Sequence, residues 1–221
     1  MILASQSPRR RQLLEEAGFA LVVRPADVDE TPLPGEAPDE LVARLSRAKA
    51  EAVRAALAAE AAATPSDTCV PGLEDGLLVA ADTIVWLADG TALGKPADAA
   101  DACRMLGLLG GRTHHVSTGV CLLHLGPHAE PLGARPFVET TEVEFHELSP
   151  ADIRAYVAGG EPLDKAGAYG IQGEGRLLVR AIRGNYDNVV GLPVARLVRE
   201  AAALTGDPDL LPTLLERKHH A

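Results

Sequence analysis

The chain has 221 residues, of which 47% are hydrophobic and 24% charged, and its formal net charge is −10. This length and composition fit one generous globular domain with a sizeable core. The acidic balance argues against a general nucleic-acid or anionic-membrane binder, because phosphate surfaces favour clustered Lys and Arg. The three cysteines lack a CxxC spacing, and the apolar start is too short for a signal peptide, so we expect a cytoplasmic protein without disulfides.

Apolar runs, periodicity and turn residues predict strands and helices that alternate along the chain. The predicted strands are 1–4, 19–25, a hairpin over 77–96 that turns at Asp89-Gly90, 113–125, 136–148 and 177–182. The predicted helices are 7–17, 39–63, 97–109, one that begins at Ser149-Pro150, 193–204 and a short one within the tail at 205–221. Residues 25–38 are expected to form a loop, and 64–76 a solvent-exposed insertion. The mixture of hairpins and crossovers predicts an α/β fold with a mixed sheet, in a single domain with two lobes around a cleft.

The first predicted helix begins with an unusual concentration of positive charge. Ser7 suits the N-cap and Pro8 the first helical position, yet the first turn then holds Arg9, Arg10 and Arg11 instead of Asp or Glu. Free backbone N–H groups, the helix dipole and guanidinium groups all favour an anion. This pattern is therefore suited to binding phosphates.

Lys49 stands out on the second predicted helix because it projects from the apolar arc, between Leu45 and Val53. One interpretation is a lysine whose ammonium reaches past the apolar surface to water. The other is a lysine that faces a cleft and meets an anionic partner, because an unpaired buried ammonium is costly.

Two acidic features are candidates for chemistry. Asp82 is predicted at the end of an apolar strand run, where a carboxylate can act as a metal ligand or general base, although a solvated strand-end aspartate is the commoner case. In "DVDETP", Asp27, Asp29 and Glu30 alternate, so one or two of them can offer oxygens to a hard cation such as Mg²⁺. A solvated acidic loop is the alternative.

Two loops add polar groups. Lys95 sits in the turn "LGKP", where it is either solvated or a phosphate contact. "DKAGAYGIQG" (164–173) combines a flexible glycine-rich turn with Gln172, whose amide can pair with the edge of a base. Several cations, two acidic groups and one base reader together indicate a Mg²⁺-dependent reaction at the phosphates of a nucleotide.

The ordered motifs of this chain resemble those of the Maf family of nucleoside triphosphate pyrophosphatases. The resemblance covers residues 1–204 and rests on "LASQSPRR", "VDE", "RAKA", "AADT", "GKP", "DKAGAYGIQG" and "GNYDNVVGLP". It implies an inosine-triphosphatase-like mixed sheet flanked by helices, and hydrolysis of a nucleoside triphosphate to a monophosphate and pyrophosphate. It also implies a divalent metal cation (Mg²⁺, with Mn²⁺ or Co²⁺ as alternatives) and a homodimer.

The resemblance also assigns roles to residues. Asp82 is implied as the general base or metal-bound carboxylate, with Glu30 as its acidic partner at the metal. The implied substrate-binding residues are Ser5, Ser7, Arg9, Arg10, Lys49, Thr83, Lys95 and Gln172. Thr83 and Gln172 fall where the family meets the base, and the other six at the triphosphate. "SPRR", "GKP" and "GIQG" resemble the branch that prefers dTTP, UTP and modified pyrimidine nucleotides.

Three alternatives stay open at this point. The chain can belong to the 7-methyl-GTP branch, although that branch typically has Glu where Gln172 stands. It can be a nucleotide-binding regulator of septum formation with little catalysis, although such a regulator needs no general base. A nucleic-acid binder that uses the arginine helix is the third, and the net charge of −10 speaks against it. The loop at 64–76 is longer than the family pattern predicts, and the tail after Thr205 matches nothing in the family.

Overall fold

The computed structural model describes residues 1–63, 71–73 and 76–219, so most of the predicted insertion lies outside the described residues. The helices are α1 (Pro8–Glu16), α2 (Pro38–Ala62), α3 (Ala99–Leu109), α4 (Pro150–Ala158), α5 (Tyr186–Val190), α6 (Val194–Thr205) and α7 (Leu210–His219). The strands are β1 (Ile2–Leu3), β2 (Val22–Val23), β3 (Leu77–Trp86), β4 (Ala92–Leu93), β5 (Thr113–Leu125), β6 (Pro131–Phe145) and β7 (Val179–Arg183). Within these ranges no helix has the length and hydropathy to cross a membrane.

The strands of the described ranges form one mixed sheet of seven strands, which confirms the predicted α/β fold. The order is β2-β1-β3-β5-β6-β7, and β4 pairs with β3 beside this path. β1 runs parallel to its two neighbours, β2 and β3. The pairs β3–β5, β5–β6 and β6–β7 are antiparallel. The predicted turn at Asp89-Gly90 joins β3 to β4, where Val85 pairs with Leu93.

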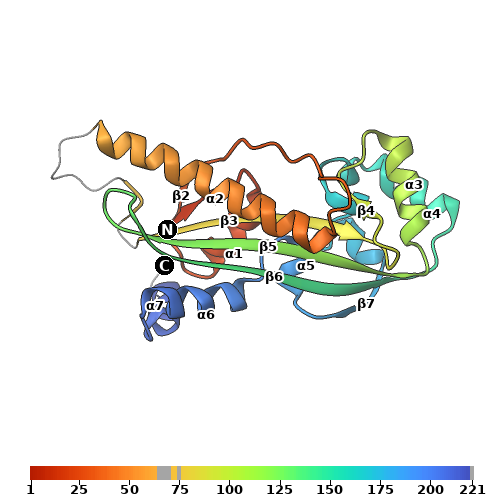
Figure 1. Ribbon diagram of the computed structural model, residues 1–221. Helices are drawn as coiled ribbons and strands as arrows, with labels where there is room; N and C mark the ends of the chain where they lie inside the picture. The colour runs from red at the N-terminus through yellow and green to blue at the C-terminus, as the bar shows by residue number, and fades with distance from the viewer. Residues whose placement is uncertain (64–70, 74–75, 220–221) are drawn as a thin grey trace.

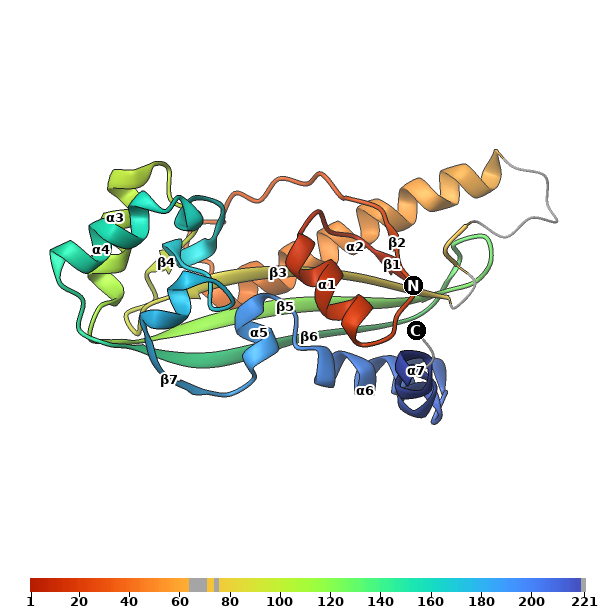
Figure 2. The same ribbon diagram turned by 180° about the vertical axis from the view of Figure 1, so that it is seen from behind.

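Helices cover both faces of the sheet (Figures 1 and 2). α2 packs on one face, where Leu45, Val53 and Leu57 are buried against even-numbered residues of β3 such as Leu78 and Ala80. The larger core lies on the other face and contains residues of α1, α5 and α6. α3, α4 and a series of short 3-10 turns gather at one end of the long sheet (Figure 1).

Four elements differ most from the sequence-based expectation. β2 spans only Val22–Val23 instead of residues 19–25, because its partner β1 has just two residues. β6 begins at Pro131 instead of residue 136, because Gly133 and Pro136 weaken the strand pattern without preventing pairing to β5. β7 begins at Val179 instead of residue 177. α5 was not predicted, because five residues are too few to show a helical period.

A cluster of rings joins the sheet to the loop that follows α4. His114 of β5 is fully buried, and its Nε2 lies 2.9 Å from the phenol oxygen of Tyr169. Both rings also meet Phe145 edge to face. Burial and, secondarily, the neighbouring charge of His115 lower the pKa of His114 to about 3. His114 is therefore neutral in the folded protein at neutral pH.

This burial predicts a pH-dependent loss of stability. A histidine with a pKa of 6.5 when unfolded and about 3 when folded favours the folded state above pH 6.5, and this contribution is lost as the pH falls toward 3. When the pH is lowered from 7.5 to 5.5, we expect the free energy of unfolding to fall by about 1.4 kcal/mol because of His114. Urea unfolding of the wild type and of His114→Gln at both pH values measures it.

The variant should lose the His114 part of the pH dependence, whatever its stability at pH 7.5. His146→Gln, a change at an exposed histidine, is the matched control and should keep the full dependence. An equal pH dependence in His114→Gln and the wild type would contradict the buried, neutral state of His114.

Candidate active site

A gap in the sheet creates the site. On one edge, every residue of β3 pairs with β5. On the other edge, the pairing with β1 stops at Val79 and the pairing with β4 starts only at Val85. Within the described residues, 80–84 thus have no strand partner on this edge. The prediction of Asp82 at a strand end is wrong, because β3 continues to Trp86 and stays paired with β5. Asp82 and Thr83 instead lie inside the strand at this gap, with side chains on opposite faces of the sheet. Both can therefore reach one cleft, which opens at the gap.

Arg10 of α1 is fixed on the Thr83 side of the gap. Its Nε donates to the carbonyl of Gly191 at 2.9 Å, one terminal nitrogen to Ser5 Oγ at 3.2 Å and the other to Thr83 Oγ1 at 2.9 Å. The N-cap Ser7 accepts a hydrogen bond from the Arg10 backbone N–H, so the helix begins directly after Ser7, as predicted. Burial lowers the pKa of Arg10, and Asp82 opposes this. The guanidinium is a pre-positioned cation.

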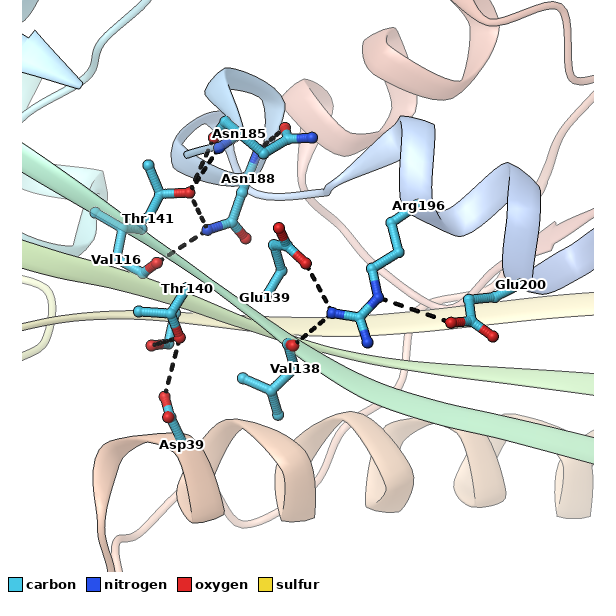
Figure 3. A network of polar contacts seen from close by, with 11 residues as sticks. Asp39, Val116, Val138, Glu139, Thr140, Thr141, Asn185, Asn188, Arg196 and Glu200 are labelled. Atoms are coloured by element: carbon cyan, nitrogen blue, oxygen red, sulfur yellow. Dashed lines mark hydrogen bonds and ion pairs between the residues drawn. The ribbon is translucent and has the colours of Figure 1, made fainter. Parts of the chain in front are cut away.

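Polar contacts of α5 and α6 with the sheet hold the chain on both sides of the Gly191 carbonyl (Figure 3). The Asn188 side-chain amide donates to the Val116 carbonyl at 2.9 Å and to Thr141 Oγ1 at 3.0 Å, which fastens α5 to β5 and β6. Arg196 of α6 donates to the Val138 carbonyl at 2.9 Å and pairs with Glu139. The chain on both sides of Gly191 is thereby tied to the sheet.

Lys49 reaches the other face of the gap because α2 lies very close to β5. Gly119 pairs with Asp82 in the sheet register, and a Cβ atom built on Gly119 would lie 2.2 Å from the Val42 carbonyl oxygen. Only a glycine lets the helix backbone come this near. Val42 and Lys49 are two helical turns apart, so the lysine points toward the sheet.

The Lys49 ammonium lies between two carboxylates. Its Nζ is 2.6 Å from an oxygen of Asp82 and 2.6 Å from an oxygen of Glu30. The side chains of Lys49 and Asp82 are 11% and 16% exposed, whereas that of Glu30 is 59% exposed. Of the two interpretations of Lys49, the structure supports the lysine that faces a cleft and meets an anionic partner.

The loop after α4 forms the far wall of the cleft. Arg9 donates to Asp164 at 3.3 Å, and Lys165 lies 2.6 Å from the same carboxylate, so this ion-pair cluster links α1 to the loop. Lys95 and Gln172 are exposed on the same side of the cleft. Tyr169 lies beneath this loop, where burial raises the pKa of its phenol.

All ten sequence-predicted site residues line one cleft of about 1080 Å³. Sequence analysis did not select Asp164 and Lys165 from their motif, nor Gly191. The motif "DKAGAYGIQG" contains the signal for the first two, whereas a backbone carbonyl such as that of Gly191 leaves none. Within the described residues the lining holds five basic side chains (Arg9, Arg10, Lys49, Lys95, Lys165) and five acidic ones (Asp27, Glu30, Asp82, Glu161, Asp164).

The arrangement can bind a chain of phosphates and present a carboxylate to a water molecule. A helix N-terminus and guanidinium and ammonium groups bind phosphate oxygens, and Asp82 lies among them on a rigid strand. No group of three or more His, Cys, Asp or Glu that could hold a metal is found in the described part of the chain. A mixed-sheet enzyme acting on an anionic, phosphate-containing ligand is the class of protein that this fold and site define.

The chain belongs to the Maf family, since the family model described as "Maf-like protein" matches residues 1–204. It is 50% identical over 205 residues to the dTTP/UTP pyrophosphatase of Anaeromyxobacter dehalogenans (strain 2CP-C), an overlap of 92% of this chain and 91% of that protein. The dTTP/UTP pyrophosphatase of Koribacter versatilis is 47% identical over 199 residues, or 90% and 91% of the two chains. That of Moorella thermoacetica is 45% identical over 207 residues, or 93% and 95%.

The contact at Gly119 predicts a large cost for one added methyl group. Gly119→Ala must push α2 off β5 or strain both backbones, and we expect a loss of about 3 kcal/mol of unfolding free energy. Denaturant unfolding measures it. Gly107→Ala in α3, where an added Cβ meets nothing within 4 Å, is the control and should raise stability by up to about 1 kcal/mol. Equal stability of Gly119→Ala and wild type would refute the close approach.

Proposed function

We propose that this protein hydrolyses nucleoside triphosphates, preferentially dTTP, UTP and modified pyrimidine nucleotides, to a monophosphate and pyrophosphate. The carrying observation is Asp82, held on the open edge of β3 between the cations of α1 and α2. The names of the similar proteins support the reaction and the substrates. The glutamine at position 172 supports the pyrimidine preference over 7-methyl-GTP.

In this proposal Asp82 accepts a proton from the attacking water. The water oxygen forms a bond to phosphorus while the bridge between the α and β phosphates breaks, and the bond electrons leave with pyrophosphate. Arg10, already fixed by Ser5 and Thr83, binds the phosphates, and Arg9 and Lys95 add charge from the walls of the cleft. Lys49 exchanges a carboxylate for a phosphate oxygen.

The residues at the gap fit a divalent cation. Glu30 and Asp82 both direct a carboxylate oxygen at a single positive group, the Lys49 ammonium, and this cluster of three has a net charge of −1. Mg²⁺ is commonly held by one or two carboxylates together with substrate phosphates and water. Glu30 and Asp82 would hold it here, with Mn²⁺ or Co²⁺ as alternatives. When bound, it would neutralise phosphate charge and acidify bound water.

The role of Asp82 predicts a loss of turnover without a loss of metal-free nucleotide binding. We expect Asp82→Asn to lower kcat by about 1000-fold, because the variant keeps the shape but loses the proton acceptor. Pyrophosphate release from a panel with dTTP, UTP, modified pyrimidine nucleotides and 7-methyl-GTP, with Mg²⁺ and with EDTA, measures it. In EDTA, where Asp82 has no cation to hold, the affinity for α,β-methylene-UTP, which is not cleaved at the bridge, should change by less than about 3-fold.

Asp89→Asn, which keeps the Asx-Gly turn between β3 and β4, is the matched control and should retain activity. Full activity in Asp82→Asn would count heavily against its role. Binding without turnover of any nucleotide by the wild type would favour the regulator of cell division.

The exposed amide of Gln172 predicts the base preference. Gln172→Glu removes the N–H donors and adds a negative charge, so kcat/KM for dTTP and UTP should fall by about 10- to 100-fold. Gln12→Glu makes the same chemical change on α1, outside the residues that line the cleft, and should leave kcat/KM unaltered. An unchanged substrate profile in Gln172→Glu would exclude base reading at this position.

A further inference from the structure

The segment 24–37, which joins β2 to α2, carries Glu30 to the cleft with little packing of its own. It has no regular helix or strand and runs beside α2 (Figures 1 and 2). Most of its residues are exposed, and Leu33, its large apolar side chain in the middle, is 55% exposed. Apolar burial therefore does not determine where Glu30 lies. Polar contacts to α2 must do so.

Arg44 makes the strongest of these contacts. Its guanidinium binds Glu36 through two nitrogens, at 2.6 Å and 2.8 Å, and also donates to the Thr31 carbonyl at 3.1 Å. Glu36 in turn accepts from the Leu33 backbone N–H at 3.0 Å. The Glu36 side chain is only 7% exposed. One arginine thus holds both the end of the segment and the residue that directly follows Glu30.

The Arg44–Glu36 pair stays ionised over the working pH range. The Arg44 side chain, and after it the Leu33 backbone N–H, lower the pKa of Glu36 to about 2. The two nitrogens and two oxygens meet in a fork-to-fork geometry that a lysine cannot reproduce. The pair is therefore a permanent link between α2 and the segment, independent of what the cleft contains.

The contact between Lys49 and Glu30, by contrast, is not permanent in the proposed reaction. In the proposed reaction Lys49 turns to a phosphate and Glu30 to a cation, so the ion pair that now holds Glu30 opens when the ligand binds. From then on, within the described residues, the contacts of Arg44 with Thr31 and Glu36 are the hydrogen bonds between the segment and α2 that lie closest along the chain to Glu30. They hold the carboxylate near Asp82 while its own partner changes.

We propose that Arg44 and Glu36 are positioning residues, which set the place of Glu30 opposite Asp82 and thereby determine how strongly Mg²⁺ supports nucleotide binding. The inference rests on the proposed function, because it takes Glu30 as a carboxylate that holds the cation. Neither residue lines the cleft. Their effect is transmitted through the backbone of residues 31–36.

The test compares nucleotide binding with and without the cation. We would titrate α,β-methylene-UTP into the wild type, Arg44→Gln and Glu36→Gln by calorimetry, once with Mg²⁺ and once with EDTA. The affinity that the wild type gains from Mg²⁺ should shrink by about 10- to 100-fold in both variants, as is typical when a group that orients a metal ligand is removed. Their affinity in EDTA should equal that of the wild type, which a general loss of structure would not allow.

Arg54→Gln is the matched control, since Arg54 lies on the same helix and pairs with Glu51 in an exposed contact, and it should keep the full gain. Arg44→Lys keeps the charge without the fork and should recover part of it. An undiminished gain in Arg44→Gln and Glu36→Gln overturns the inference, as does an equal loss in Mg²⁺ and EDTA. If one of the two does not fold, the other decides, because each breaks the same pair.

The wild type separates this inference from the proposed function. If it hydrolyses UTP but gains no affinity from Mg²⁺, the positioning inference fails and the reaction stands. If it hydrolyses no nucleotide although Mg²⁺ strengthens binding of the analogue, the proposed reaction fails and the variants still decide the role of Arg44.

Discussion

The Lys49 ammonium between Glu30 and Asp82 is the contact on which the site depends, because it brings charged groups of α2, β3 and the loop 24–37 together at the gap. The Lys49 side chain is 11% exposed, and an ammonium in such a position is costly unless it is paired, so α2 requires carboxylates at this point of the sheet. Asp82 is supplied by a rigid strand and Glu30 by an exposed loop. With one cation and two anions the cluster keeps a charge of −1, which leaves it attractive to a further cation.

The gap in the sheet explains how groups from both faces can serve one ligand. Side chains of adjacent strand residues point to opposite faces, and a complete sheet would separate Lys49 on α2 from Arg10 on α1. At residues 80–84 the neighbouring strands β1 and β4 leave one edge of β3 open, so Asp82 and Thr83 meet in the same cleft. Gly119, on the paired edge, completes the arrangement because it lets α2 approach.

Sequence reasoning found the elements whose signals are local. Pro at the helix start, the Asp-Gly turn and the β-rich run of β5 predicted the helices and strands that hold the site. The ordered motifs predicted ten residues that line one cleft. The contacts of these residues could not be predicted from the sequence. Arg10 binds the backbone of Gly191, 181 positions away, and a backbone carbonyl is the same at every residue. α5, which holds that carbonyl, is too short to have a detectable period.

Four basic side chains of the cleft differ in whether their partners are neutral or carboxylates, and this difference affects which ligand can bind. Arg10 donates to a carbonyl and two hydroxyls, so its charge is not neutralised by its own partners. Lys49, Arg9 and Lys165 are each paired with carboxylates and must exchange them for a phosphate. A polyanion that brings no divalent cation would displace these carboxylates into mutual repulsion. A nucleotide that arrives with Mg²⁺ brings the charge that those carboxylates then need, which is the electrostatic argument for a metal-bound triphosphate as the ligand of this cleft.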